Sequence, residues 1–320
     1  MRVLVAGATG AVGRNLLPRL LTAGHQVVGT TRTEAKAARI RALGGTAVVA
    51  DGLDAEAMRR AVATTEPDVI VHEMTNLKGA SDLRHFDRVF HISNRLRTEG
   101  TDHLLSAARQ GGVKRFVAQS FCGWPYARVG GALKSETDAF DPDPPQQLRR
   151  TLEAIRYLEK AVTQAADVGG IVLRYGAFYG PDTGMLEENM IAQIGRRRVP
   201  LIGNGDGYWS FIHIEDAAAA TLAAIERGAP GNIYNIVDDD PAPVHAWLPA
   251  LAAMLGAKPP RHVPAWLARL IAGEHLVVMM TQARAGTNGK AKRDLGWLPV
   301  HPSWRQGFAQ IVAEARAKPS

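Results

Sequence analysis

The chain has 320 residues, of which 46% are hydrophobic and 22% are charged, and this composition excludes a disordered chain and predicts a packed core. The net charge of +7 is spread along the sequence, with Arg196 to Arg198 as the longest basic run and no zinc-finger spacing, so we expect no nucleic-acid partner and infer a basic protein that binds an anionic small molecule. The single cysteine, Cys122, excludes an internal disulfide, and no run reaches the roughly 18 apolar residues of a membrane span, so we expect a cytoplasmic protein.

The chain opens on a strand, a glycine turn and a helix start. Residues 3–6 are apolar and predict a buried strand, glycines follow at Gly7, Gly10 and Gly13, and a helical pattern begins at Arg14. Glycine allows the backbone angles and the close approach that a pyrophosphate needs, and the amides of a helix start bind the anion. This context predicts a dinucleotide site at the first crossover, and the alternative is an ordinary strand-to-helix turn.

Strands and helices then alternate through the first two-thirds of the chain, which is typical of a parallel sheet covered on both faces. Further strands are predicted at 25–31, 46–50, 68–72, 115–120 and 170–175, and helices at 34–43, 55–62, 86–110, 151–165 and 217–225. Asp54 is the expected N-cap of the helix 55–62. The predicted fold class is α/β, with a doubly wound parallel sheet of Rossmann type.

A long segment rich in glycine and proline, residues 121–147, follows the fifth strand, and loops of this length usually form lids or site walls. We predict a dinucleotide-binding domain over residues 1–177, to which 211–237 returns. Residues 178–210 and 238–320 would form a smaller, discontinuous C-terminal substrate lobe. A cleft between the two parts would bind a small-molecule substrate.

Seven motifs along the chain carry a family resemblance. They are GATGAVG at 7–13, DGLD at 51–54, DVIVH at 68–72, GVKRFV at 112–117, LRYGAFYGP at 173–181, FIHIED at 211–216 and LGW at 295–297. In this order they resemble the extended short-chain dehydrogenase/reductase superfamily, in particular its NAD-dependent epimerase/dehydratase group, over essentially the whole chain. The resemblance implies a Rossmann fold, a nicotinamide dinucleotide and a homodimer paired through the two long helices after the fourth and fifth strands.

The resemblance also implies contacts to the cofactor. The implied residues are Gly7, Thr9, Gly10, Ala11, Val12 and Gly13 at the pyrophosphate, Asp51 and Gly52 at the adenine, Met74 and Thr75 at the ribose, and Tyr175, Gly176 and Phe178 along the nicotinamide, with Ser120 as a further contact. Residues 73–75 depart from the small residues usual at that place. For Asp51, the alternative is a cap at the end of a strand.

The end of the second strand bears on the choice between NAD and NADP. NAD-preferring proteins place an acid there, whereas this chain has Thr30, Thr31 and Arg32. An arginine beside two hydroxyl groups suits a 2′-phosphate, and the lack of an acid removes a repulsion. We therefore predict NADP, with NAD as the alternative if Arg32 is only a solvated surface charge.

The family's usual proton-transfer residues are missing. Its chemistry uses a Tyr-x-x-x-Lys pair, in which the lysine lowers the pKa of the tyrosine, together with a serine or threonine. No Tyr-x-x-x-Lys occurs in this chain. Aligning Glu159 with the glutamate that commonly follows the lysine places Thr151 and Ile155 at the pair, and Gly123 falls where the serine or threonine is expected.

Tyr126 is the predicted replacement proton donor, because it follows the fifth strand at the carboxyl edge of the sheet. The alternative is an aromatic residue packed in a proline turn. Tyr157 with Lys160 as a helical pair, and Lys134 on the long loop, are further candidates, and Cys122 is expected to be a packing residue. No spacing of histidines and carboxylates indicates a metal site.

These observations predict an atypical NAD(P)-dependent oxidoreductase that reduces a carbonyl, an imine or an activated double bond of a small organic molecule. An activated alkene or an iminium ion needs less acid assistance than a ketone does. Two alternatives stay open. One is a non-redox isomerase, lyase or cyclase on the same scaffold, and the other is a dinucleotide-sensing regulatory protein.

Overall fold

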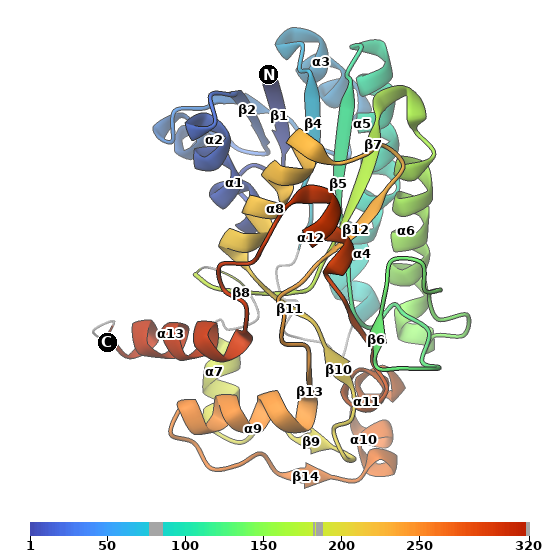
Figure 1. Ribbon diagram of the computed structural model, residues 1–320, viewed down its shortest axis with the longest axis vertical. Coiled ribbons are helices and arrows are strands. Elements are labelled where there is room, and N and C mark those ends of the chain that lie inside the picture. Colours follow the sequence, from blue (N-terminus) through green and yellow to red (C-terminus); the bar gives the residue numbers. More distant parts are fainter. Residues whose placement is uncertain (77–85, 182, 184–187, 318–320) are drawn as a thin grey trace.

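The computed structural model describes residues 1–76, 86–181, 183 and 188–317. Its centre is a seven-stranded parallel sheet with the strand order β12-β7-β5-β4-β1-β2-β3 (Figure 1). The strands are β1 (Arg2–Ala6), β2 (Gln26–Thr31), β3 (Thr46–Val49), β4 (Val69–His72), β5 (Arg115–Phe121), β7 (Gly170–Tyr175) and β12 (Ile233–Ile236). The order reverses at β1, since β2 and β4 lie on its two sides. This is the predicted doubly wound arrangement, and it is confirmed.

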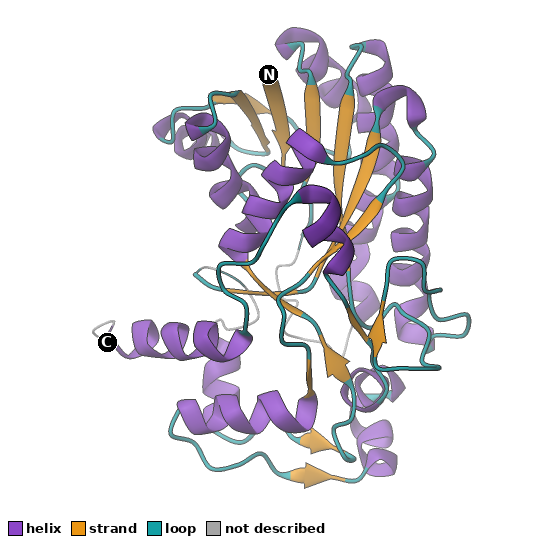
Figure 2. Ribbon diagram, viewed as in Figure 1, coloured by secondary structure: helices purple, strands orange, loops and turns teal. Residues whose placement is uncertain are grey.

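Helices cover both faces of the sheet (Figure 2). One face carries α1 (Ala11–Thr22), α2 (Glu34–Ala42), α8 (Ile214–Arg227) and α12 (Gly289–Leu295), and the other carries α3 (Ala55–Thr65), α4 (Phe86–Arg97), α5 (Glu99–Gln110) and α6 (Gln146–Thr163). Side chains alternate along a strand, so Val3 and Val5 enter the first core while Leu4 and Ala6 enter the second. This double burial is why the strand reads as a continuous apolar run.

The helix predicted over 86–110 is two helices, α4 and α5, which break at Thr98. The backbone of Thr98 leaves helical geometry, with φ −97° and ψ −82°, and its hydroxyl bonds the carbonyl oxygen of Asn94 at 3.1 Å. Such back-bonding by threonine bends helices. The expected N-cap is confirmed, because the Asp54 carboxylate accepts from the Ala57 amide at 3.0 Å.

A smaller lobe lies beyond the carboxyl edge of the sheet, at the lower end of Figure 1. Its elements are β8 (Ala177–Tyr179), α7 (Glu188–Gly195), β9 (Leu201–Ile202), β10 (Tyr208–Trp209), β11 (Phe211–His213), β13 (Ala242–Pro243), α9 (Val244–Met254), β14 (His262–Val263), α10 (Ala265–Ala272), α11 (Glu274–Thr281) and α13 (Trp304–Ala317). An aromatic core that includes Trp247, Trp304 and Phe308 holds these elements together.

Part of the C-terminal third packs on the sheet instead of in the lobe. Strand β15 (Ala285–Gly286) pairs with β6 (Leu133–Lys134) in the long loop after β5. Leu295 and Trp297, at and just after the end of α12, are buried in the same core as α8. Among the described residues, no helix is both long enough and apolar enough to cross a membrane.

Candidate active site

The glycine turn between β1 and α1 follows a backbone path that only glycine allows. Gly7 has a positive φ of 93°, and a Cβ there would lie 2.6 Å from the carbonyl oxygen of Glu73. A Cβ on Gly13 would lie 2.6 Å from the carbonyl oxygen of Gly7. Thr9 lies half-buried in the same turn. These close approaches explain why the turn carries glycine at both ends.

The start of α1 leaves backbone donors without a helical acceptor. Gly10 is its N-cap and offers no side-chain cap, and the first intrahelical bond runs from the Arg14 amide to the Gly10 carbonyl at 3.0 Å. The amides of Ala11, Val12 and Gly13 precede this bond and have no acceptor within the helix. Together with the helix dipole they are suited to hold a phosphate group.

The end of β2 places a hydroxyl group beside a guanidinium. Thr31 is buried, and its Oγ1 has no hydrogen-bond partner among the described residues. Arg32 is exposed, and within the described part of the chain no carboxylate pairs with it. A hydroxyl without a hydrogen-bond partner and a guanidinium without a carboxylate, on adjacent residues, are suitable donors for a phosphate.

The end of β3 gives a mixed result for the predicted adenine contacts. Asp51 is exposed, and its Oδ1 accepts from the Leu53 amide at 3.0 Å, which is the capping role that the sequence left open. Gly52 is buried, and a Cβ there would overlap the sulfur atom of Met74. Gly52 therefore brings the chain after β3 into contact with the chain after β4, where Thr75 lies half-buried.

Strand β4 ends on a neutral histidine. His72 is buried, its Nδ1 accepts from the Met74 amide at 3.3 Å, and its Nε2 lies 3.1 Å from the Leu96 carbonyl oxygen. Burial lowers the pKa of His72 to about 4. The ring therefore fixes the chain after β4 and is not poised to transfer protons near neutral pH.

Glu73 is a buried acid next to the glycine turn. Its side chain is 4% exposed, Oε1 accepts from the Tyr175 hydroxyl at 3.0 Å, and Oε2 has no partner among the described residues. Burial raises the pKa of Glu73 to about 8. A carboxyl group held neutral adds no negative charge beside an anion site. Its sequence signal is an acid directly after an apolar strand.

The chain after β7 contributes one partly exposed ring. Tyr175 is fully buried, and its hydroxyl lies 2.7 Å from Oγ1 of Thr221 on α8. A Cβ on Gly176 would lie 2.8 Å from the Ser210 carbonyl oxygen, so glycine lets β7 continue closely past this segment. Phe178 is half-buried, with its ring centroid 5.4 Å from that of Tyr175. Of these predicted nicotinamide contacts, Phe178 has the accessible ring.

The positions of the missing catalytic residues hold no proton donor that is free to act. Thr151 and Ile155 are each 1% exposed on α6. The Asn94 side chain donates to Oγ1 of Thr151 at 2.9 Å. Gly123 is buried with φ 137°. A small hydroxyl, an alkyl group and a glycine therefore replace the tyrosine, the lysine and the serine or threonine.

A buried polar network, formed by Ser120, Tyr126, Glu159, Arg174 and Asn235, lies between β5, β7, β12 and α6. Arg174 binds both carboxylate oxygens of Glu159, at 2.8 and 2.7 Å, and Ser120 donates to Glu159 at 2.6 Å. The Tyr126 hydroxyl donates to Oδ1 of Asn235 at 2.7 Å and accepts from Arg174 at 3.1 Å.

This network gives Tyr126 an internal environment. Its side chain is fully buried, and burial raises the pKa of the hydroxyl above its ordinary range. A hydroxyl that is inaccessible, harder to ionise and bonded on both sides is suited to hold the long loop against β12. The structure thus favours a packing role for Tyr126 over that of a proton donor, and Ser120 likewise faces Glu159.

Aromatic rings gather beside Gly123, the position expected for the family's serine or threonine, since a Cβ there would lie 3.5 Å from the ring of Phe121. We call Phe86, Phe90, Phe121, Trp124 and His275 the aromatic cluster. Ring centroids lie 4.3 Å apart for Phe86 and Phe90, 5.8 Å for Phe86 and Trp124, and 6.3 Å for Phe121 and Trp124. His275 of α11 lies 6.2 Å from Phe86, so the cluster joins α4, the chain after β5 and the small lobe. Sequence reasoning did not find it, because its members are distant in the chain.

The other candidate side chains are buried or bonded to groups outside the candidate site. Cys122 is buried, which raises its pKa to about 12 and disfavours a thiolate. The Lys134 ammonium group donates to the Val129 carbonyl at 2.8 Å. The Tyr157 hydroxyl bonds the exposed Asp102 carboxylate at 2.6 Å instead of pairing with Lys160.

His213, Asp216 and His301 form a group that the sequence did not reveal. Their ligand atoms lie within 4.8 Å of one another, and the two imidazole rings stack with centroids 3.6 Å apart. The Asp216 carboxylate accepts from the amides of Val300 and His301 at 2.9 and 2.8 Å and lies 3.1 Å from Nδ1 of His301. With its oxygens used in this way, Asp216 ties the chain before α13 to α8.

The residues at the carboxyl edge of β1 and β2 fit a bound dinucleotide. The uncapped start of α1 supplies amides for a pyrophosphate, and the buried Thr31 hydroxyl supplies a donor that lacks a partner among the described residues. The glycines let a ligand approach the backbone. Nothing in the described part of this edge carries an unpaired negative charge, since Glu73 is held neutral by burial.

Comparisons with known proteins identify the family to which a chain with these features belongs. A model of the NAD dependent epimerase/dehydratase family matches residues 3–237. The 3-diazoavenalumate denitrifying reductase of a Streptomyces species is 40% identical over 311 residues, which are 97% of this chain and 100% of that protein. The 4-hydroxy-2-methyl-3-oxo-4-farnesyl-3,4-dihydroquinoline-1-oxide ketoreductase of Stigmatella aurantiaca is 27% identical over 318 residues, covering 93% of this chain and 92% of its own.

Among solved structures, the UDP-glucose 4-epimerase of Thermotoga maritima, determined with UDP-glucose, superposes with a TM-score of 0.77. It is 22% identical, and the match covers 99% of each chain, so it supports the fold. The reductase relatives and the family match identify an NAD(P)-dependent oxidoreductase-like enzyme. The resemblance read from the seven motifs is confirmed, and the chain belongs to the NAD-dependent epimerase/dehydratase family.

Proposed function

We propose that this enzyme is an NADP-dependent reductase that replaces a diazonium group of a planar organic substrate by hydrogen and releases dinitrogen. The observation that carries the proposal is the substitution of the proton-transfer residues by Gly123, Thr151 and Ile155, together with the aromatic cluster next to Gly123. The relative that is 40% identical is named a denitrifying reductase of a diazo compound. A diazo group is not among the three acceptors that the sequence predicts.

The chemistry of this reaction matches a site without an acid. When bound, the reduced dinucleotide supplies one hydride. The carbon that bears the diazonium group gains the hydride as a C–H bond, and the electron pair of the C–N bond leaves with dinitrogen, so the step balances without a proton. A ketone would instead become an alkoxide that needs a proton donor. The absence of the Tyr-x-x-x-Lys pair therefore does not impair the reduction of a diazonium ion.

The aromatic cluster provides the matching binding surface. Phe121 is the last residue of β5 and Trp124 comes shortly after it, at the carboxyl edge of the sheet, and both rings are half-buried. Aromatic faces attract cations, most strongly at tryptophan, and they exclude water. A planar diazonium cation would be held by stacking and by this attraction. The role of these side chains is to position the substrate and shield it from water, which otherwise competes for the diazonium carbon.

The dinucleotide would be held by residues at the edge of β1 and β2. The amides that follow Gly10 would bind the pyrophosphate, and Thr31 with Arg32 would bind a 2′-phosphate. Phe178 and Thr75 are half-buried side chains that follow the ends of β7 and β4. A homodimer paired through the helices after β4 and β5 stays a prediction, as does a cytoplasmic location.

The test uses 4-carboxybenzenediazonium with ¹⁵N at both nitrogens, and NADPH that carries deuterium at the transferable position. We expect labelled dinitrogen in a one-to-one ratio with oxidised NADPH, and a product with one deuterium at the former C–N carbon. Reactions without enzyme, and with heat-denatured enzyme, correct for spontaneous decay. Oxidation of NADPH without dinitrogen, or hydrogen drawn from water, would refute the proposal. If the enzyme reduced a matched ketone or activated alkene and not the diazonium ion, the substrate would belong to one of those classes instead.

Two variants make the assay specific for the aromatic cluster. Trp124→Ala removes the half-buried ring at the end of β5, whereas Trp266→Ala removes a tryptophan on α10 that is 63% exposed. We expect the first variant to lower kcat/KM for the diazonium ion about tenfold or more, a loss equivalent to about 1.4 kcal/mol, and the second to leave it unchanged. Equal effects would show that the cluster does not bind the substrate.

A further inference from the structure

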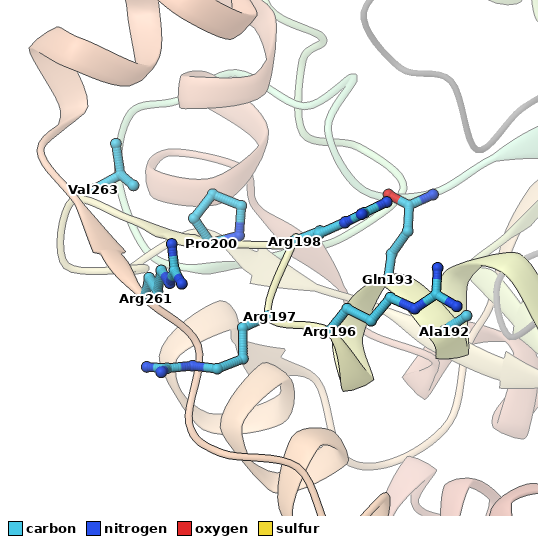
Figure 3. A pocket seen from close by; sticks show the side chains of 8 residues that line it. All are labelled: Ala192, Gln193, Arg196, Arg197, Arg198, Pro200, Arg261 and Val263. Atoms are coloured by element: carbon cyan, nitrogen blue, oxygen red, sulfur yellow. The ribbon is translucent and has the colours of Figure 1, made fainter.

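A hollow in the small lobe is lined largely by arginines (Figure 3). It has a volume of about 580 Å³ and lies between the end of α7 and β14. Arg196, Arg197 and Arg198 follow α7, and Arg261 directly precedes β14. We call this hollow the arginine groove. It lies in the lobe, away from the glycine turn after β1 (Figure 1).

The charges of the groove are not neutralised by the protein. Among the side chains that the structure describes, no carboxylate pairs with any of the four arginines. Exposed arginines elsewhere do pair, as Arg41 does with Glu34 and Arg109 with Asp167. The groove thus concentrates four positive charges in a chain whose net charge is +7. Four unpaired cations in one hollow repel each other unless an anion joins them.

The helix end explains only part of this arrangement. Cations at a helix C-terminus interact favourably with its dipole, which favours Arg196 to Arg198 after α7. Arg261 comes from a different element and gains nothing from that dipole. Arg197 has a φ of 56°, in the left-handed region that glycine adopts most easily. An arginine at this place is not what the backbone alone would favour.

The side chains divide the groove into two parts (Figure 3). Arg196 and Arg198 extend to the same side of the chain as Gln193, whereas Arg197 extends to the other side, where its Nε donates to the Pro259 carbonyl at 2.8 Å. Arg261 lies beside Pro200, on the same side as Arg197. Three guanidinium groups are therefore available to a ligand, and the fourth helps to fix the loop.

We propose that the arginine groove binds a ligand with two or more linked phosphate groups, as a site separate from the dinucleotide site. Guanidinium groups present forked donors that match phosphate oxygens in pairs. A single carboxylate would neutralise one of the available arginines, whereas linked phosphates carry enough charge for all three. The apolar lining is limited to small residues such as Ala192 and Val263, so recognition rests on charge.

The test titrates the full-length protein with sodium tripolyphosphate by calorimetry at fixed ionic strength. The variant R196A/R198A/R261A removes the three available arginines. The control variant R60A/R109A/R149A removes three exposed arginines on α3, α5 and α6, so that both variants lose the same charge. We expect one site in the wild type and in the control, and at least tenfold weaker binding in the groove variant.

A second series separates the groove from the dinucleotide site. NADPH binding is followed by its fluorescence in the same three proteins, and we expect equal affinities. The variant R196K/R198K/R261K keeps the charge but loses the forked donors, and we expect affinity for tripolyphosphate between the wild type and the alanine variant. No binding by the wild type at millimolar tripolyphosphate, equal binding by both arginine-to-alanine variants, or loss of NADPH in step with tripolyphosphate would overturn the proposal.

Discussion

Arg32 is the residue on which the choice of dinucleotide depends. It is exposed at the end of β2, next to the orphaned hydroxyl of Thr31, and within the described chain it has no acidic partner. Loss of one charged contact to a phosphate costs about 1.5–3 kcal/mol, or roughly ten- to hundredfold in affinity. We expect Arg32→Ala to weaken NADPH by such a factor and NADH by less than threefold. Calorimetric titration with each dinucleotide measures both, and an equal loss would remove the assignment of the 2′-phosphate.

Glu73 links the candidate site to pH. The ordinary pKa of a glutamate is near 4.5, and burial raises that of Glu73 to about 8. Between these two pKa values, Glu73 is ionised in the unfolded chain but keeps its proton in the folded protein. The free energy of unfolding is therefore highest at low pH and falls as the pH rises through this range. The slope is about 1.4 kcal/mol per pH unit for one group. Urea denaturation at pH 5 to 9 should show this decline.

The variant Glu73→Gln isolates that contribution. Glutamine keeps the acceptor for the Tyr175 hydroxyl but does not ionise, so we expect a shallower decline of the free energy of unfolding between pH 5 and 8. Asp238 is also buried with a pKa raised to about 8, so part of the decline should remain. A pH profile identical to that of the wild type would mean that Glu73 is solvated in the folded protein.

Tyr126 separates a structural role from a catalytic one. Its hydroxyl donates to Asn235 and accepts from Arg174 inside the protein. Tyr126→Phe would leave the Asn235 oxygen without its donor, at a cost of about 1–3 kcal/mol in the free energy of unfolding. We expect kcat of the folded variant to stay within about threefold of the wild type, a difference of about 0.7 kcal/mol in the barrier. A large fall in kcat with unchanged stability would instead support the proton-donor hypothesis.

At the scale of elements, the end of α7 is built on an unusual residue. The Arg197 amide bonds the Ile194 carbonyl at 2.9 Å and the Arg198 amide bonds the Gln193 carbonyl at 2.8 Å, which is the pattern of a helix that ends on a left-handed residue. Arg197 occupies that left-handed position with φ 56°. Glycine is the residue usually found there.

A pair of substitutions measures the backbone effect alone. Arg197→Gly and Arg197→Ala both remove the bond to Pro259, and they differ only in the Cβ atom. A Cβ in the left-handed region costs about 1 kcal/mol, so we expect the glycine variant to be more stable than the alanine variant by about that amount in thermal or urea denaturation. Equal stability would mean that the loop relaxes out of the left-handed conformation.

The elements that were predictable from sequence are those with local signals. The first glycine turn depends on Gly7, Gly10 and Gly13 and on their flanking patterns, and the capping of α3 depends on Asp54 alone. The break at Thr98 was not predictable in this way, because threonine is tolerated within helices and the apolar period continues from α4 into α5. The aromatic cluster has no local signal, since Phe86, Trp124 and His275 meet only in the folded chain.

At the scale of the whole molecule, the contacts that were missed join residues far apart in sequence. Tyr126 was considered because it follows the fifth predicted strand, whereas β12, which carries Asn235, was not among the predicted strands. Nothing local indicates that the long loop crosses to β12. In the same way, no local pattern indicates that Leu295 and Trp297 pack in the core beside α8. Which distant segments pack together depends on the side chains that the whole fold buries, and no single segment determines this.

Asp216 contributes one of the contacts that join the two parts of the molecule. It is 1% exposed at the start of α8, and its carboxylate accepts from the amides of Val300 and His301, just before α13 enters the lobe. Asp216→Asn would turn one acceptor into a donor that faces these amides, with an expected loss of about 2–4 kcal/mol. His301→Ala removes only the side-chain contact and should cost about 1 kcal/mol. Because the carboxylate couples α13 to the sheet domain, we expect calorimetric unfolding of Asp216→Asn to begin with the C-terminal segment, and limited proteolysis to cut near residues 298–303. A single transition with the stability of His301→Ala would show that the aromatic core around Trp304, without the carboxylate, is sufficient to hold the lobe to the sheet.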